Sequence, residues 1–147
     1  RPWKGKTMNI RPMTIADYDR VYALWMSCKN MGFNNLDDSR EGIDRLLKRN
    51  PNTCLVAVED GEIAGVILAG NDGRRGYLYH VAVGADYRRR GVGTELVQKA
   101  MRSLRRAGIR KTALVVYNNN LDGNEFWERM GFTPREDLVY RNKELIS

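Results

Sequence analysis

Residues 88–94, with the sequence Arg-Arg-Arg-Gly-Val-Gly-Thr, constrain this chain more than any other segment. They follow an apolar strand-like run and precede a long amphipathic stretch. A glycine loop that opens a helix leaves the first N–H groups of the helix without partners, at the positive end of the helix dipole, and lets a ligand approach them. The segment therefore predicts a phosphate-binding loop.

Positive charge is concentrated around this loop. Residues 88–111 contain nine Lys or Arg and one acid, Glu95, which is a local charge of +8 against +7 for the whole chain. The sequence pI of about 9.6 is compatible with a nucleotide coenzyme and with nucleic acid. Charge alone does not choose between these ligands.

Length and composition favour one domain with a buried core, because 147 residues with 42% apolar side chains suffice for it. We expect this domain over residues 8–147, with residues 1–7 either a remnant of cloning or a short natural extension. The sequence has no apolar run of membrane-spanning length and no secretion signal, so we expect a cytoplasmic protein without membrane contact. Two cysteines and one histidine predict neither a disulfide framework nor a metal site.

Hydrophobic periodicity predicts strands at 9–13, 53–58, 62–69, 77–83 and 112–117, and a terminal hairpin that adds residues 137–146 to the sheet. Helices are expected after Thr14, after Asp38, after Gly91 and around 126–130. We expect Asp17 and Glu41 to complete the caps of the first two. The pair Asp60-Gly61 predicts a tight hairpin turn.

Two common nucleotide loops do not fit the glycine spacing. A P-loop requires a lysine directly after its last glycine, and Thr94 follows Gly93 here. A dinucleotide-binding fingerprint requires a third glycine where Leu96 stands, and it belongs to a parallel unit rather than to a hairpin. The pattern that remains is Arg-x-x-Gly-x-Gly between an apolar strand and a helix.

This pattern resembles the GNAT superfamily of acetyl-CoA-dependent N-acetyltransferases, in its single-domain bacterial type. A second motif, Asn120 followed by Phe-Trp-Glu-Arg-Met-Gly-Phe at 126–132, supports the resemblance, which covers about residues 9–140. It implies an α/β fold with mixed α+β character. The sheet would be curved, mostly antiparallel, flanked by helices and splayed between its fourth and fifth strands.

The same resemblance implies where acetyl-CoA, the co-substrate, would bind. The backbone of two strand residues would pair with the pantetheine arm, and N–H groups of the loop would surround the pyrophosphate. The implied coenzyme-binding residues are Val81, Val83, Arg88, Arg89, Arg90, Gly91, Val92, Gly93, Thr94, Asn120, Phe126 and Trp127. The N–H of Val81 would also stabilise the oxyanion.

Proton transfer has less support in the sequence. The acceptor amine must lose a proton, and the family places bases on the strand where this chain has Tyr77 and Tyr79. We hypothesise a water relay through either tyrosine, with His80 as the fallback, although all three also suit structural packing roles. Trp127 stands where many relatives have tyrosine, and an indole N–H can donate a hydrogen bond but is no proton source.

The predicted function is transfer of acetyl from acetyl-CoA to a primary amine by direct attack in a ternary complex, without a metal. Phe33 and Tyr140 are the expected acceptor-site residues, while the acceptor could be a small amine, a protein N-terminus or a lysine. A monomer and a homodimer are both compatible with the sequence. One alternative is a catalytically impaired acetyl-CoA-binding regulatory module, suggested by Trp127 and the missing acidic base. A weaker one is a nucleic-acid-binding domain, which would lack interleaved exposed aromatics.

Overall fold

The computed structural model describes residues 8–28 and 32–146. These divide after Tyr117 into two compact units. The first is built on a five-stranded sheet and the second on a single helix. None of the helices in the described ranges is long and apolar enough to cross a bilayer.

The sheet of the first unit has the strand order β1-β2-β3-β4-β5. Its strands are β1 (Asn9–Pro12), β2 (Leu55–Glu59), β3 (Glu62–Asn71), β4 (Gly76–Val83) and β5 (Thr112–Ala113). Neighbours are antiparallel except β4 and β5, which are parallel. The predicted mixed, mostly antiparallel sheet is confirmed.

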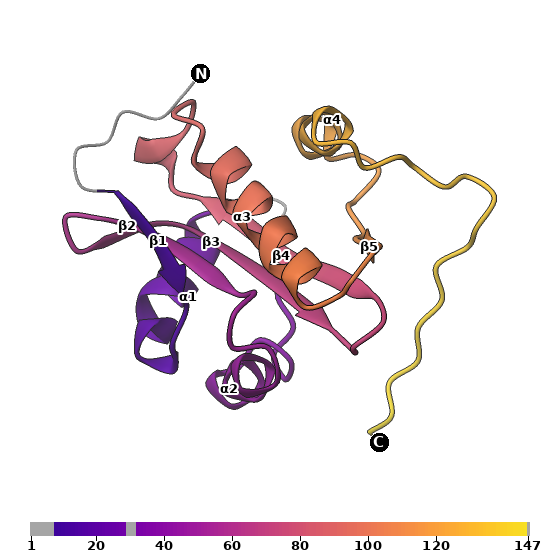
Figure 1. The fold of residues 1–147 in the computed structure, drawn as a ribbon, viewed down its shortest axis with the longest axis horizontal. Coiled ribbons are helices and arrows are strands. Elements are labelled where there is room, and N and C mark those ends of the chain that lie inside the picture. The colour runs from indigo at the N-terminus through magenta and orange to yellow at the C-terminus, as the bar shows by residue number, and fades with distance from the viewer. Residues whose placement is uncertain (1–7, 29–31, 147) are drawn as a thin grey trace. The chain divides into compact units, whose positions relative to one another are not determined.

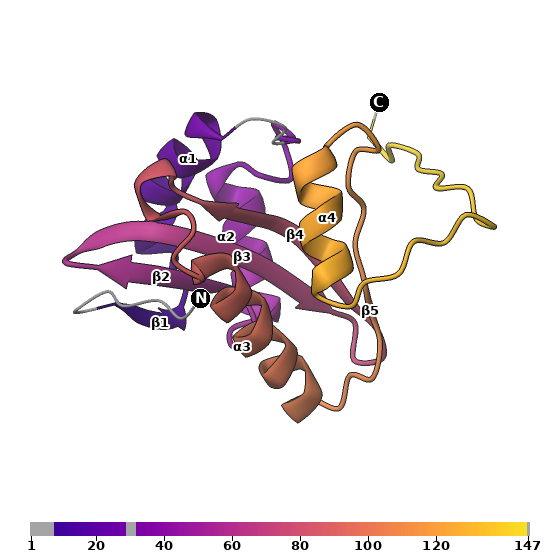
Figure 2. The same ribbon diagram turned by 90° about the horizontal axis from the view of Figure 1, so that it is seen from above.

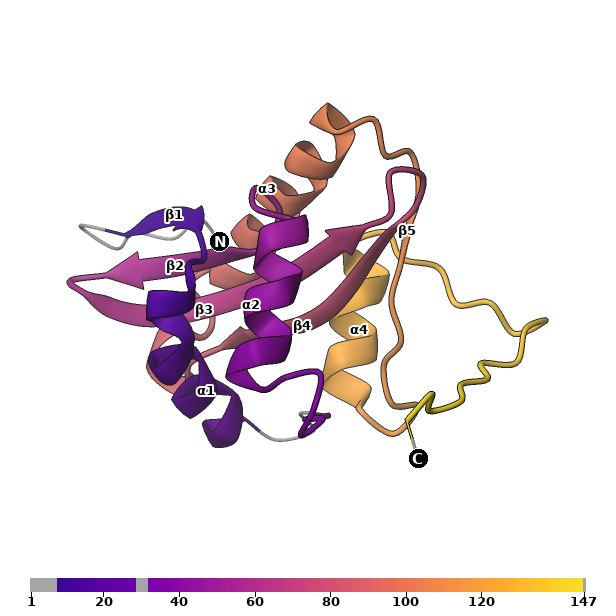
Figure 3. The ribbon, with the colours of Figure 1, turned by 90° about the horizontal axis from the view of Figure 1, so that it is seen from below.

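Helices cover both faces of this sheet (Figures 1 and 3). The 3-10 turn η1 (Ile15–Asp17), α1 (Tyr18–Ser27) and α2 (Arg40–Arg49) precede β2, while η2 (Ala85–Tyr87) and α3 (Val92–Arg106) follow β4. Helices α1 and α2 lie on one face, and α3 lies on the other (Figure 2). The amphipathic pattern explains the position of α3, because its buried residues recur at helical spacing: Val92, Leu96, Val97, Ala100 and Leu104.

Local signals place the turns as the sequence predicts. Asp60 and Gly61 both have positive φ, 51° and 80°, as a tight hairpin turn between β2 and β3 requires. Gly108 follows α3 with φ 87°, the left-handed conformation that commonly ends a helix. At the start of α2, however, Ser39 rather than Asp38 is the cap, and its hydroxyl accepts from Gly42 N–H at 3.1 Å.

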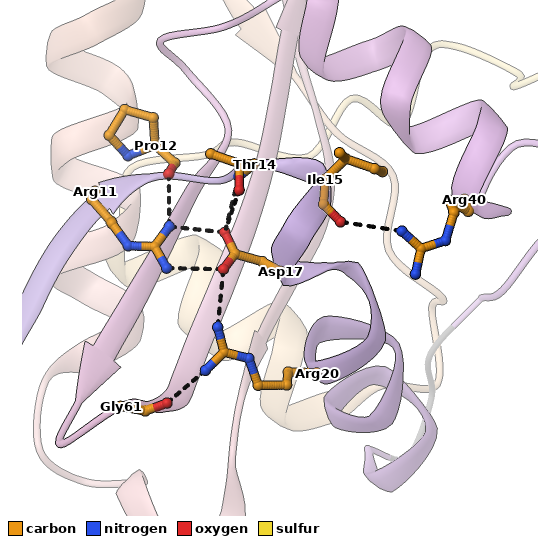
Figure 4. A network of polar contacts seen from close by, with 8 residues as sticks. All are labelled: Arg11, Pro12, Thr14, Ile15, Asp17, Arg20, Arg40 and Gly61. Carbon is orange, nitrogen blue, oxygen red and sulfur yellow. Dashed lines mark hydrogen bonds and ion pairs between the residues drawn. The ribbon is translucent and has the colours of Figure 1, made fainter.

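Asp17 joins three parts of the first unit (Figure 4). Its carboxylate is 2% exposed and accepts two hydrogen bonds from Arg11 of β1, at 2.8 and 2.9 Å. It also accepts from the Thr14 N–H at 2.9 Å, as the predicted cap requires, and from Arg20 at 3.2 Å. Arg20 in turn donates to the carbonyl of Gly61 in the β2–β3 turn, at 2.6 Å.

Strand β4 departs from the regular alternation of side chains between the two faces of a sheet. The register slips by one residue, because Leu68 pairs with His80 while Ala69 pairs with Leu78. Such a bulge places an extra residue in one strand and bends it. As a result, Tyr79 and His80 both lie on the face of α1 and α2, although adjacent residues of a regular strand point to opposite faces.

The fifth strand is shorter than the predicted 112–117. Its pairing with β4 covers Gly76 with Thr112 and Tyr77 with Ala113, and regular structure then ends. The bulge in β4 starts directly beyond this point, and a bulge that bends its strand tends to end pairing there. The two strands therefore pair only at one end, as the expected splay requires.

The second unit contains α4 (Leu121–Arg129). Residues 133–146 form neither helix nor strand, so the predicted terminal hairpin is wrong. Leu138, Val139 and Tyr140 are exposed and are followed by four polar residues, a pattern without the period of two that a half-buried strand needs. Within the described part of this unit there is also no strand with which such a segment could pair.

Candidate functional site

The loop between β4 and α3 leaves backbone donors exposed at the start of the helix. Gly91 is the N-cap with φ 78°, and its carbonyl accepts from Glu95 N–H at 3.0 Å. Among the described residues no side chain caps this end. The N–H groups of Val92, Gly93 and Thr94 therefore lack intrahelical acceptors and are free to bind an anion.

Arg89 in this loop has φ 63°, a left-handed conformation that is costly for a residue with a Cβ. Strained backbone of this kind is common at ligand-binding sites, where the surrounding fold holds it in place. Two left-handed residues, Arg89 and Gly91, thus shape the turn that precedes the free N–H groups.

The three loop arginines differ in what they contact. Arg90 forms an ion pair with Glu59 of β2 at 2.6 Å and lies over the ring of Tyr87. Arg88 donates from Nε to the carbonyl of Val83 at 3.2 Å. Within the described ranges, the guanidinium of Arg89 has neither a hydrogen bond nor an ion pair, so it is the arginine most available to a ligand.

The edge of β4 presents backbone groups beside this loop. Because the Val83 carbonyl accepts from Arg88, the polar groups of Val83 point away from β3. The two-residue period of a strand places those of Val81 on the same side. Cys28, at the end of α1, lies here too, with Sγ 4.0 Å from the Val83 carbonyl oxygen and 3.9 Å from the Arg88 guanidinium.

His80 is held by a carboxylate that the sequence alone did not connect with it. Its Nε2 lies 2.9 Å from Oδ2 of Asp38, and both side chains are largely buried, 12% and 8% exposed. The same Asp38 oxygen accepts from Asn34 N–H at 2.9 Å, and Tyr18 donates its hydroxyl proton to the Asp38 carbonyl. Because an ionised carboxylate can only accept, the imidazole tautomer that fits this contact has its proton on Nε2 and its lone pair on Nδ1.

Several aromatic rings lie on the same face of the sheet as this pair. The ring of Trp25 lies 5.1 Å from that of His80, and Phe33 lies 6.5 Å from Trp25. The ring centroids of Tyr77 and Tyr79 lie 4.8 Å apart, with the ring planes tilted by 51°, on the same face of the sheet, and Tyr79 is exposed. The bulge places Tyr79 and His80 on the α1/α2 face, where the predicted residues Phe33 and Tyr77 also lie.

The remaining predicted residues belong to the second unit. The Asn120 side chain caps α4 by accepting from Gly123 N–H at 3.0 Å. Phe126 and Trp127 contact each other edge to face, and Trp127 contacts Phe132 in the same way. Tyr140 is exposed.

Two features of this site escaped sequence reasoning. Asp38 was interpreted as a helix cap. It lies 42 residues before His80, and no sequence motif links two residues at that separation, so their contact could not be predicted. The sequence also did not connect Cys28 with the edge of β4, where this partly buried residue lies while still packing against the core. Among residues 8–28 and 32–146, no three His, Cys, Asp or Glu side chains gather as a metal site would require.

Known proteins resemble the chain in sequence and in fold. Residues 18–132 match the model of the Acetyltransferase (GNAT) family. An acetyltransferase of Pectobacterium atrosepticum is 34% identical and one of Sodalis glossinidius 31%, each over 95% of this chain and 96% of the relative.

Solved structures share the fold at lower identity. Ard1 from Thermoplasma volcanium superposes with a TM-score of 0.76 at 21% identity, over 86% of this chain and 82% of that one. PaiA N-acetyltransferase from Thermoplasma acidophilum, solved in complex with coenzyme A, gives 0.75 at 18% identity, over 88% and 92%.

Proposed function

Because the chain belongs to the GNAT acetyltransferase family, we propose that it transfers acetyl from acetyl-CoA to a primary amine by direct attack in a ternary complex. The observation that carries this proposal is the start of α3, where N–H groups free of intrahelical partners lie beside the outward backbone of β4. A diphosphate suits the first feature, and an extended amide chain suits the second.

The residues of the loop between β4 and α3 would bind the coenzyme in different ways. The N–H groups of residues 89–94 would face the pyrophosphate, with the Arg89 guanidinium adding charge. Arg90 would act through its backbone and anchor the loop, since its guanidinium is paired with Glu59. Arg88 would release the Val83 carbonyl when a pantetheine amide takes its place.

Acetyl transfer places three demands on the protein. The thioester supplies the acetyl group, and the amine lone pair forms a C–N bond to the carbonyl carbon as the C–S bond breaks. The carbonyl oxygen gains negative charge, which the N–H of Val81 on the open edge would stabilise. The thiolate leaves with the electron pair of the C–S bond, and a thiol pKa of about 8.5 makes this tolerable near neutrality without a tyrosine at position 127.

The amine proton is the demand that His80 would meet. Asp38 would accept a hydrogen bond from Nε2–H and fix the ring, which leaves the Nδ1 lone pair to take up the amine proton through water and the hydroxyl of Tyr79, whose side chain is exposed. A base positioned in this way typically contributes about 10²- to 10⁴-fold in rate. The buried Asp38–His80 pair thus favours an active enzyme over a module that only binds the coenzyme.

The test is an acetyl-transfer assay over a panel of small amines, lysine peptides and peptide N-termini, with release of free thiol as the readout. We expect one class of amine to be acetylated, and His80→Gln to lower kcat by roughly 100-fold while the KM for acetyl-CoA stays within about 2-fold.

Tyr79→Phe is the matched variant, because it removes only the hydroxyl of the relay. We expect a smaller loss of kcat, on the order of 10-fold. Coenzyme binding without transfer to any amine would favour the regulatory module instead. Unchanged kcat in His80→Gln would remove His80 from the mechanism.

A further inference from the structure

A second polar cavity lies on the α3 side of the sheet, away from the loop. Its volume is about 620 Å³, within the range of roughly 300–1,000 Å³ typical of small-ligand pockets. The C-terminal half of α3, strands β1 and β2 and the turn that follows α2 all contribute to its walls. All of these elements belong to the first unit.

The walls of this cavity carry four cations and no acid. The basic residues are Arg49, Lys99, Arg102 and Arg106, and none of the lining residues is Asp or Glu. Throughout the described ranges, none of the four has a carboxylate partner within 4.0 Å. Their charge is therefore not neutralised by the protein.

Three of these cations form one stripe on α3. Lys99, Arg102 and Arg106 are spaced by three and four residues, which places them on the same face of the helix with Ser103 between them. Like charges at this spacing on a helix repel each other. A bound anion would remove this repulsion.

The cavity floor is preformed. Asn50, 6% exposed, accepts from the backbone and side-chain N–H groups of Asn71 at 2.9 and 3.1 Å. Buried Thr53 donates its hydroxyl proton to the carbonyl of Ala69. These bonds hold the turn after α2 in place without using the cations above it.

The cavity is separate from the proposed coenzyme loop. At 1.5 Å per residue along α3, Lys99 lies about 12 Å and Arg106 about 22 Å from Gly91. The same ligand group cannot occupy both ends of the helix.

We propose that this cavity binds a small organic anion that carries two or more phosphate groups. Guanidinium groups match phosphate oxygens in a planar, bidentate manner, and three of the four cations are arginines. The cavity is partly open to solvent, and its volume of about 620 Å³ matches a small molecule. This inference does not depend on the proposed acetyl transfer.

The test uses fructose 1,6-bisphosphate as probe, in calorimetry with saturating coenzyme A so that the α3 loop is filled. We expect one bisphosphate per chain, with affinity that falls as salt is raised. Lys99→Gln/Arg102→Gln/Arg106→Gln should weaken binding at least 10-fold. Arg102→Gln alone should weaken it less, and it keeps the test valid if the triple variant fails to fold.

The matched control is Arg105→Gln/Arg110→Gln/Lys111→Gln, which removes the same charge from residues outside the cavity. It should change the bisphosphate affinity by no more than about 2-fold. Equal loss in both triple variants would show a general charge effect and overturn the site, as would no binding at all. Tighter binding of citrate would overturn the phosphate assignment, and tighter binding of a single-stranded RNA oligonucleotide would indicate a nucleic-acid surface.

A variant in the loop before α3 tests whether the cavity and the proposed coenzyme site are independent. Gly91→Asp should weaken coenzyme binding on the order of 100-fold and leave bisphosphate binding intact. Loss of both in that variant would contradict two independent sites.

Discussion

Single side chains decide both the acid stability and the thiol chemistry of this protein. Asp17 has its pKa below the ordinary value, chiefly because Arg11 donates hydrogen bonds to its carboxylate. A carboxyl group with a lowered pKa in the folded state stabilises the fold above its unfolded pKa, about 3.9 for Asp. That contribution is lost as the pH falls through the lower, folded pKa.

We therefore expect Asp17→Asn to lower the free energy of unfolding at pH 7 by about 2–3 kcal/mol, because Arg11 and Thr14 lose a charged acceptor. Urea unfolding at pH 7 and pH 3 measures this, and the difference from the unsubstituted chain should shrink at pH 3. Asp19→Asn is the control, since its partner Arg40 and Asp19 itself are exposed and the loss should stay below about 1 kcal/mol. A pH-independent difference for Asp17→Asn would show that charge is not its role.

The two cysteines should react very differently. Burial raises the pKa of Cys54 to about 11, and this thiol is fully buried, whereas Cys28 lies partly exposed beside the Val83 carbonyl. Iodoacetamide at pH 8 should label Cys28 and leave Cys54 unlabelled until the protein is unfolded, as read by mass spectrometry.

Acetyl-CoA should slow the labelling of Cys28 if pantetheine lies along the edge of β4. Cys54 in the same sample is the internal control. Labelling of Cys28 at an unchanged rate under saturating acetyl-CoA would contradict that path.

At the scale of elements, the start of α3 carries the coenzyme proposal. Gly91→Asp should raise the Kd for acetyl-CoA on the order of 100-fold, because it adds negative charge where a pyrophosphate would bind. Calorimetry with acetyl-CoA is the measurement. Gly91→Asn is the matched control, because it shares the strain of φ 78° without the charge and should lose much less affinity.

For Trp127 of α4 we expect a much smaller effect on substitution than for Gly91. Trp127→Phe should retain most of the turnover, because the thiolate can leave without a proton from position 127. Steady-state kcat is the readout. A loss of turnover as large as that of Gly91→Asp would show that Trp127 has a catalytic role.

At the scale of the whole molecule, ligand binding should appear as thermal stability. A ligand at 100 times its Kd stabilises the folded state by about 2.7 kcal/mol, which for a chain of this size raises Tm by roughly 5–10 °C. Thermal unfolding with and without acetyl-CoA tests this, and Gly91→Asp should show almost no shift. Equal shifts in both proteins would place the coenzyme elsewhere.

Features that depend on neighbouring residues were predictable from the sequence. The loop at 88–94, the Asp60-Gly61 turn and the buried stripe of α3 each follow from short-range backbone geometry and helical period, and the structure confirms the turn and the stripe. The terminal hairpin failed because a strand requires a pairing partner as well as apolar residues. The coenzyme contacts stay a prediction.

The amino-acid sequence by itself determined the mixed sheet, the glycine-opened helix and membership of the family, since local spacing and backbone conformation encode them. Only the tertiary structure decided that Asp38 contacts His80, that Glu59 forms an ion pair with Arg90, and that four cations line one cavity. Each of these depends on side chains far apart in the chain, and the bulge in β4 turns Tyr79 and His80 to one face. The hydrophobic periodicity of the sequence does not specify these contacts, because they depend on how the sheet and its helices pack.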